Sequence, residues 1–380
     1  MSVPAYTDQD LYGASRKPQS SDIAQGNLGD CYLLSSLGAV AAHQPETIEN
    51  AIHYNADNGS FTVTMHNPDH PNAGPVQIEV TQADLRVDKG IGVDSNGYWN
   101  QSGNPPLWPE VMESAYAKMM ADKAKLPETM QGDLHHIEAG YPSNAIYAIT
   151  GQHDQTIPAS SLGNLDRAYD QLHQAVQDGR PMILSTMPMK DMPNDGLVKG
   201  TWNEADPSKN SGHAYILEGV SKDAHGDVML TLRNPWGNNN DRGQGVTSAD
   251  ATVTVSLKQI IDNGHLESID IGPAATRQQE QTKGQTQQHN GSQQKDGPAP
   301  GISSGCPYVD KLMESMGDPK AFDQALKELG ASPYADAFRA ESHAANVQLQ
   351  NQQLQHQVTQ QQTQIQQLQQ QPVVQQGPMR

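Results

Sequence analysis

Hydrophobic positions in the front half of the chain predict mainly helices. Residues 30–42 are apolar almost without interruption, which indicates a helix buried on all sides. A second helix is predicted from Leu107, because Pro109 then falls in the first turn, where its missing N–H costs nothing. Two shorter runs of alternating apolar residues, 61–65 and 76–80, predict strands.

The region that follows is rich in predicted strands. A tight turn at 223–226 joins two of them into a hairpin. A helical half followed by a β half indicates an α+β unit of two lobes, helical over about 1–160 and antiparallel β over about 161–272. The predicted strands are 181–186, 213–221, 227–235 and 251–257.

The composition of the chain changes near residue 273. Residues 273–306 are Gln, Gly and Pro rich and contain almost nothing to bury, which predicts a disordered linker. Within 307–345 apolar residues recur at helical spacing, and Gly330 suits the end of a helix. We therefore predict a small helical unit after the linker.

The last segment, 346–380, is a Gln-rich tail with two interpretations. Between Val347 and Gln371 it contains no Asp, Glu, Lys or Arg, and its apolar residues recur over about three heptads. One interpretation is a short coiled coil through which copies of the chain self-associate. The other is a disordered glutamine tract whose few aliphatic residues fall in register by chance.

Charge, cysteine content and targeting features narrow the function. The formal net charge of −19 argues against nonspecific binding to nucleic acid or anionic lipid. Two cysteines, Cys31 and Cys306, are too few for a disulfide framework and too far apart for a zinc site. There is no apolar run of about 18 residues, so we expect no membrane span. We expect a cytoplasmic protein, with export as an effector without a conventional signal peptide as the alternative.

Cys31 is the candidate nucleophile. It stands in the first turn of the predicted buried helix, after the glycine-containing segment 25–30. Main-chain amides at a helix start favour the thiolate over the thiol, which is the activation that a nucleophilic cysteine requires. The alternative is an inert packed side chain, the commoner role of a lone cysteine.

His213 and Asn234 are the candidate base and orienting residue. His213 opens one strand of the hairpin and Asn234 ends the other, so the two side chains can lie together at its open end. The oxygen of Asn234 would accept one imidazole N–H and leave the other nitrogen for the sulfur, and Trp236 would cover that hydrogen bond. Alternatively, His213 is a polar strand end and 234–237 is an ordinary turn.

Gln25 completes the candidate site. Its side-chain amide and the main-chain N–H of Cys31 would bind the oxyanion of a tetrahedral intermediate. The alternative is a surface glutamine in a Gln-rich chain.

Five segments resemble, in order, the motifs of calpain-type cysteine proteases of the papain-like superfamily. Together they span about residues 22–260, and five motifs in register make the resemblance specific. The segments are QGNLGDCYLLSSL (25–37), LWPEVMESAYAK (107–118), 138–151, GHAY (212–215) and LRNPWG (232–237).

The resemblance implies a two-lobed papain-like protease core over 1–272. It implies Cys31 as nucleophile, His213 as base, Asn234 as orienting residue and Gln25 in the oxyanion hole. The expected activity is hydrolysis of peptide bonds in protein substrates through a thioester acyl-enzyme. Two alternatives remain: a catalytically silent binding module, and a thiol acyltransferase of the same fold.

Two departures from the family pattern matter. Tyr32 stands where the family usually has tryptophan, which alters the cleft but removes no catalytic group. Calcium-dependent members carry acidic ligands in both lobes; Asp22 matches one such position, but the residues after Trp236 lack the acidic stretch. We therefore expect no cofactor and weak or absent calcium control, with Asp22 as a surface acid.

Overall fold

The computed structural model describes residues 6–93, 105–124, 134–240, 247–248 and 250–275, together with Lys311 and Lys327. The chain divides into two units, Met1–Gln281 and Thr282–Arg380. Lys311 and Lys327 belong to the second unit, and both are helical. Apart from these two and residues 273–275, the predicted linker, helical unit and Gln-rich tail lie outside the described residues.

The helical lobe of the first unit is built around one enclosed helix, α2 (Cys31–His43). Every residue from Tyr32 to Ala41 is buried, so the predicted fully buried helix is confirmed. The lobe also contains helices α1 (Asp8–Tyr12), α3 (Pro45–Ala51), α4 (Gln82–Ile91), α5 (Trp108–Ala124) and α6 (Pro142–Thr150) and an antiparallel sheet of β1 (Ile52–Asn55), β2 (Ser60–His66) and β3 (Pro75–Val80).

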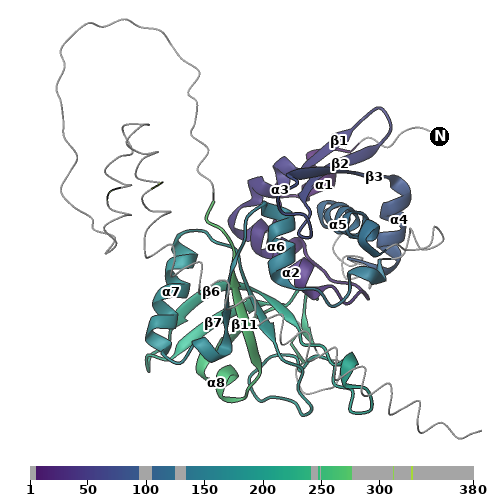
Figure 1. The fold of residues 1–380 in the computed structure, drawn as a ribbon. Helices are drawn as coiled ribbons and strands as arrows, with labels where there is room; N and C mark the ends of the chain where they lie inside the picture. The colour runs from purple at the N-terminus through teal and green to yellow at the C-terminus, as the bar shows by residue number, and fades with distance from the viewer. Residues whose placement is uncertain are drawn as a thin grey trace, which may run out of the picture. The chain divides into compact units, whose positions relative to one another are not determined.

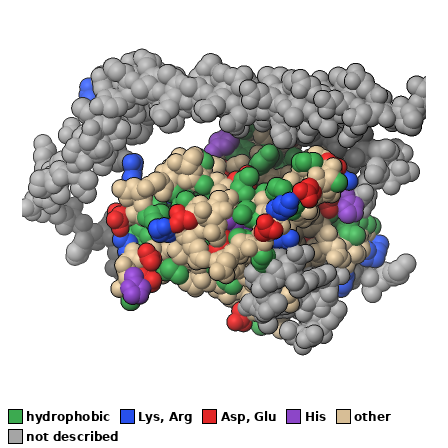
Figure 2. All heavy atoms as spheres, turned by 90° about the horizontal axis from the view of Figure 1, so that it is seen from below, with side chains coloured by type: hydrophobic (Ala, Val, Ile, Leu, Met, Phe, Trp, Pro, Cys, Tyr) green, Lys and Arg blue, Asp and Glu red, His purple; other side chains and the backbone are tan. Residues whose placement is uncertain are grey.

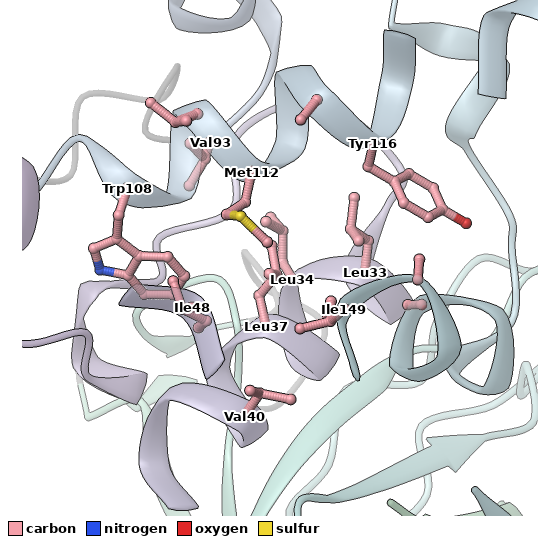
Figure 3. Packing of buried hydrophobic residues seen from close by; sticks show 14 of the residues in the cluster. Leu33, Leu34, Leu37, Val40, Ile48, Val93, Trp108, Met112, Tyr116 and Ile149 are labelled. Carbon is pink, nitrogen blue, oxygen red and sulfur yellow. The ribbon is translucent and has the colours of Figure 1, made fainter. Parts of the chain in front are cut away.

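The core of this lobe lies between α2 and α5. Leu33, Leu34 and Leu37 of α2 share a buried cluster with Trp108 and Met112 of α5, and none of the five is exposed (Figure 3). Complete burial of such a side chain contributes about 1.5–3 kcal/mol. The helix that begins at the candidate nucleophile is therefore held rigidly by the core of its lobe.

A six-stranded antiparallel sheet forms the second lobe. Its strand order is β10-β7-β6-β5-β11-β4, and a separate short pair, β8 with β9, follows β7 in sequence. The strands are β4 (Gln155–Pro158), β5 (Met182–Thr186), β6 (Ala214–Lys222), β7 (Val228–Arg233), β8 (Asn239–Asn240), β9 (Thr247–Ser248), β10 (Thr252–Ser256) and β11 (Leu266–Ile271).

Strand β6 belongs to two cores at once. Ala214 and Ile216 join the core of the helical lobe, whereas Tyr215 and Leu217 join a second core beneath the sheet. Successive side chains of a strand point to opposite faces, so α2 packs on one face of β6 while α7 (Leu165–Gln177) packs on the other (Figure 1). A short helix, α8 (Leu257–Asp262), contacts β7 and β10. The two lobes therefore share the strand that follows His213.

The mixed architecture of helices and antiparallel sheet agrees with the predicted fold class. The predicted strands correspond to β2, β3, β5, β6, β7 and β10, and the predicted turn is present, since the N–H of Gly226 donates to the carbonyl of Asp223 at 3.1 Å. Helix α7 was not predicted, although Asn164 caps it by accepting the N–H of Arg167 at 3.0 Å.

The surface carries charges of both signs. Acidic and basic side chains are interspersed on the face shown in Figure 2. Exposed pairs such as Lys190–Glu204 and Lys222–Asp166, each with N and O 2.7 Å apart, are screened by solvent and contribute little to stability. None of the helices among the described residues combines the length and apolarity that spanning a bilayer requires.

Candidate active site

Cys31 is the first residue of α2 and stands half-buried on the wall of a cavity of about 410 Å³. Its helix is docked directly on the sheet, because the hydroxyl of Ser35 donates to the carbonyl of Ala214 at 3.0 Å. The main-chain N–H of Ala214 also lies close enough to the Cys31 thiol to lower its pKa. The sulfur therefore lies beside the residue that follows His213 in the chain.

The electrostatics of Cys31 differ from the sequence-based expectation. The amide of Ala214 in β6 lowers the pKa of the thiol, and so do the amides of Tyr32 and of Cys31 itself, as expected for the start of a helix. Burial outweighs them, and the neighbouring Asp30 adds to it, so that the pKa of Cys31 is raised to about 12. The uncharged thiol is the resting form.

His213 and Asn234 are brought together by the β6–β7 hairpin. The Nε2 atom of His213 lies 2.9 Å from Oδ1 of Asn234, and both side chains are buried. The backbone of His213 is fixed by Thr186, which donates its N–H to the His213 carbonyl at 2.8 Å and accepts the His213 N–H on its hydroxyl at 3.0 Å. Burial lowers the pKa of His213 to about 4, so the imidazole is neutral at physiological pH.

Trp236 covers this pair. The ring centroids of Trp236 and His213 are 4.6 Å apart, and the main-chain N–H of Trp236 donates to Oδ1 of Asn234 at 3.0 Å. The Asn234 oxygen thus meets two donors, the Trp236 amide and the His213 ring. Because Asn234 is 0 % exposed, water does not compete for that oxygen.

Cys31 and His213 line the same cavity from the two lobes. No hydrogen bond joins the Cys31 sulfur to the His213 ring in the described structure, so the free ring nitrogen remains available. Apart from Cys31 and His213, the residues that line the cavity are uncharged. They contribute glycines, side-chain amides and hydroxyls, and Leu28 and Trp236 are the larger apolar side chains among them. The described part of the cavity wall contains no Asp, Glu, Lys or Arg.

Gln25 lies on the same wall, but its amide is directed into its own loop. Nε2 donates to the carbonyl of Leu28 at 2.7 Å and makes a long contact of 3.4 Å with Oδ1 of Asp30. Its main-chain N–H donates across the lobes to the carbonyl of Pro235 at 2.7 Å. The structure therefore brings Gln25 to the candidate site and ties it to the segment that holds Asn234. It also shows that Gln25 is 4 % exposed rather than a surface glutamine.

Asp22 is not the surface acid that the sequence suggested. It is buried, and its Oδ2 accepts the indole N–H of Trp108 at 2.8 Å and the main-chain N–H of Gln19 at 2.9 Å. Burial raises the pKa of this carboxyl. A hard cation needs several converging oxygens, and among the described residues no three His, Cys, Asp or Glu side chains are grouped to hold a metal ion. The carboxyl of Asp22 instead ties α5 to the loop before Cys31.

A buried group of carboxyls behind Cys31 was missed by the sequence analysis. Asp30, Asp88 and Glu113 are each 0 % exposed, and burial is the main reason that the pKa of each carboxyl stands well above its ordinary value. Glu113 accepts the N–H of Val93 at 2.7 Å, and Asp88 accepts the hydroxyl of Ser114 at 3.0 Å. The only signal in the sequence was that Glu113 stands between apolar residues of the predicted helix, next to Met112 and close to Ala115.

Comparison with known proteins gives a family. The sequence profile described as calpain family cysteine protease matches residues 8–259. Calpain-13 of Rattus norvegicus is 26% identical over 247 residues, which cover 62% of this chain and 31% of that protein. Calpain-14 of Homo sapiens is 26% identical over 254 residues, covering 64% of this chain and 32% of that protein. A protein named Thiol protease from Porphyromonas gingivalis is 25% identical over 243 residues, 60% of this chain and 46% of that protein.

The fold and the cavity define a cysteine protease domain of two lobes. The chain belongs to the calpain family of cysteine proteases, as the resemblance of its motifs predicted. It spans about a third of the length of the two animal calpains and just under half of the bacterial thiol protease.

Proposed function

We propose that this chain is a cysteine endopeptidase that cleaves peptide bonds in protein substrates. Cys31 is the nucleophile, His213 the general base and acid, and Asn234 the residue that orients His213. The observation that carries the proposal is the 2.9 Å contact between His213 Nε2 and Asn234 Oδ1 on the cavity that Cys31 also lines. Because an amide oxygen only accepts, Nε2 carries the ring proton and Nδ1 is free to take one from the sulfur.

The reaction starts from a neutral thiol and a neutral imidazole. As the sulfur of Cys31 attacks the peptide carbonyl, its proton passes to Nδ1 of His213, and the carbonyl oxygen becomes an oxyanion. His213 then gives that proton to the leaving amine, and a thioester remains on Cys31. Water deprotonated by His213 attacks the thioester, and the returning proton restores the thiol as the carboxylic acid product leaves.

The oxyanion would be held by the main-chain N–H of Cys31 and by Gln25. Nε2 of Gln25 donates to the carbonyl of Leu28 and makes a longer contact with Oδ1 of Asp30. We assign Gln25 as an oxyanion donor because it lines the cavity together with Cys31. Loss of a single oxyanion donor typically lowers kcat about a hundredfold to a thousandfold.

The test is peptidase activity on an unfolded protein substrate. Cys31→Ala should abolish cleavage, whereas Cys306→Ser, which removes the other cysteine, should leave it unchanged. Mass spectrometry of a rapidly quenched reaction should find the acyl group on Cys31. Cleavage by Cys31→Ala at the wild-type rate would refute the proposal. A folded wild-type protein that cleaves no protein substrate and forms no acyl group on Cys31 would point to the silent binding module.

We infer further that this activity needs no calcium. Support comes from Asp22, the position matching a first-lobe ligand, whose Oδ2 is already taken by Trp108 and Gln19. Activity should persist in excess chelator, in the same buffer and at the same ionic strength. A loss that calcium restores, and magnesium does not, would show this inference to be wrong.

A further inference from the structure

The amide of Asn234 is held on its far side by a second asparagine. Nδ2 of Asn234 donates to Oδ1 of Asn239 at 3.1 Å, and both side chains are 0 % exposed. Asn239 is the middle one of three consecutive asparagines. Its two neighbours, Asn238 and Asn240, line the cavity instead. Asn239 is therefore the member of the three that touches the residue orienting His213.

Two main-chain groups fix which way the Asn239 amide points. Its Nδ2 donates to the carbonyl of Gly196 at 2.9 Å, and a carbonyl can only accept. On the other side, the hydroxyl of Tyr215 accepts the N–H of Val198 at 2.9 Å and donates to Asn239 Oδ1 at 3.1 Å. An exchange of the nitrogen and oxygen of Asn239 would break the contact with Gly196, because the amide oxygen cannot donate to a carbonyl. The oxygen of Asn239 must therefore face Asn234.

The orientation of the Asn239 amide determines that of the Asn234 amide, and Asn234 in turn determines which ring nitrogen of His213 carries the proton. Since Asn239 offers an acceptor, Asn234 must turn its NH₂ toward it and its oxygen toward His213. The Trp236 N–H agrees with this orientation, because it also donates to the Asn234 oxygen. His213 Nε2 consequently meets an acceptor and carries the proton, which leaves Nδ1 unprotonated for the sulfur.

We propose that Asn239 is a positioning residue that sets the tautomer of His213 through Asn234. The inference rests on the proposed peptidase function, in which Nδ1 of His213 is the base. The loop Asp195–Val198 is the fixed end of this chain of hydrogen bonds. The carbonyl of Gly196 can only accept a hydrogen bond, and the N–H of Val198 can only donate one. Asn239 connects these two groups to Asn234 and so to the candidate site.

The fixed end is itself anchored by a buried contact between Asp195 and His265. Oδ2 of Asp195 lies 2.9 Å from Nδ1 of His265 and accepts Nδ2 of Asn263 at 3.0 Å. Its other oxygen accepts the N–H of Leu197 at 3.2 Å. The side chains of Asp195 and His265 are 1% and 0% exposed, so the pair is shielded from solvent. The loop that directs Asn239 is therefore held independently of Cys31 and its helix.

The first experiment is a double-mutant cycle on kcat. Asn239→Leu keeps the volume but removes every polar contact of the side chain. It should lower kcat about tenfold to a hundredfold, less than most of the 10² to 10⁴ that a general base supplies. KM should change little. In an Asn234→Ala background the same substitution should cost nothing further, because Asn239 acts through Asn234. Losses that multiply in the double variant would overturn the proposal.

The second experiment reads the tautomer directly and does not depend on activity. In Cys31→Ala protein with ¹⁵N-labelled histidine, the His213 signals, assigned with His213→Gln, should show Nε2 protonated and Nδ1 not. Asn239→Leu should mix the two tautomers, and Asn239→Asp, which keeps the acceptor oxygen, should restore the single form. Asn58→Asp is the control for the change of charge, since the exposed Asn58 also accepts two hydrogen bonds on Oδ1, both from Ser60, but in the other lobe.

The outcomes separate the two claims. Unchanged His213 signals in Asn239→Leu would overturn the role of Asn239, whether or not the protein is a peptidase. Mixed tautomers in a protein that cleaves nothing would uphold that role and count against the peptidase function. A drop in stability with an unchanged tautomer would show Asn239 to be merely structural, and would also overturn the inference.

Discussion

The hydroxyl of Ser35 donates to the carbonyl of Ala214 at 3.0 Å, and this bond joins the helix that begins at Cys31 to the strand that follows His213. Ser35 is one turn after Cys31 in α2, and Ala214 directly follows His213. Both are buried. The distance between the candidate nucleophile and the candidate base is therefore set by the packing of α2 on β6, rather than by the loops around the cavity.

Ser35→Ala should reduce both stability and turnover. It removes a buried hydrogen bond between the lobes, which costs about 1 kcal/mol, and it loosens the placement of Cys31 against His213. We expect a lower urea midpoint and a lower kcat. Ser36→Ala is the matched control, because Ser36 donates at 2.7 Å to Tyr32 within the same helix. The idea fails if Ser36→Ala reduces kcat as much as Ser35→Ala does.

Gly38→Ala should disrupt the same interface by overpacking. A Cβ at Gly38 would lie 2.3 Å from Cδ1 of Ile216, and forcing extra volume into a packed core costs about 1–3 kcal/mol. The urea midpoint should fall, and adding Ile216→Val, which removes that Cδ1, should recover part of it.

A second helical glycine provides the control for this substitution. A Cβ at Gly90 in α4 would meet nothing within 4 Å. Gly90→Ala should therefore be stabilising, by about 0.5–1 kcal/mol, because alanine favours the helix. Equal loss of stability from the two substitutions would contradict the packing argument.

The protonation state of Cys31 can be read from its alkylation rate. With the pKa of the thiol raised to about 12 and that of His213 lowered to about 4, the resting pair is uncharged. In Cys306→Ser protein, the rate of reaction with iodoacetamide should rise about tenfold for each pH unit between pH 6 and 9, as the thiolate fraction does. The measurement is loss of free thiol with time at each pH.

A charged resting pair of Cys31 and His213 would give a different dependence of the alkylation rate on pH. A thiolate–imidazolium pair would give a rate that is already high at pH 6 and flat to pH 8. That plateau would show that the amides at the start of α2 outweigh burial. Asn234→Ala in the same assay indicates whether the orientation of His213 affects the thiol.

Glu113→Gln should flatten the decline of stability as the pH rises above about 5. The raised pKa of Glu113 means that the folded protein keeps a proton that the unfolded chain releases above its ordinary value near 4.5. Stability contributed by that proton is complete below about pH 4 and is lost as pH rises toward the folded pKa, by about 1.4 kcal/mol per pH unit per proton. Urea unfolding at pH 5 and pH 8 should show a smaller difference for Glu113→Gln than for the wild type.

An exposed glutamate is the control for this measurement. Glu204 pairs only with the exposed Lys190 among the described residues, so Glu204→Gln should keep the wild-type difference between pH 5 and pH 8. If Glu113→Gln behaves in the same way as Glu204→Gln, the buried carboxyl is not the source of the pH dependence.

Local sequence patterns were enough to place the parts of the site that lie on regular elements. The hairpin of β6 and β7 follows from two alternating runs and the turn between them, and a hairpin necessarily brings its two open ends together. This is why His213 and Asn234 could be expected side by side. The helix beginning at Cys31 could be predicted equally well, because an uninterrupted apolar run of this length is typical of a buried helix.

Features that depend on packing between distant parts of the chain could not be predicted from the sequence. Asp22 and Glu113 are charged residues in amphipathic surroundings, and such residues are usually solvated; only the tertiary structure shows that Trp108 and Val93 bind them. Asn239 could not be distinguished from Asn238 or Asn240, because the partner that selects it, Gly196, is 43 residues away. Helix α7, by contrast, was predictable and was missed: its buried residues Ala168, Leu172 and Ala175 recur at helical spacing.

The cavity between Cys31 and His213 has a wall of peptide groups, amides and hydroxyls. A peptide bound there would be recognised by hydrogen bonding to its backbone and by shape, since the described wall offers its side chains no ionic partner. Added salt screens attraction between ions over about 10 Å at 0.1 M but leaves short neutral hydrogen bonds intact. The affinity of this cavity for a peptide should therefore change little with ionic strength, although the chain as a whole is strongly anionic.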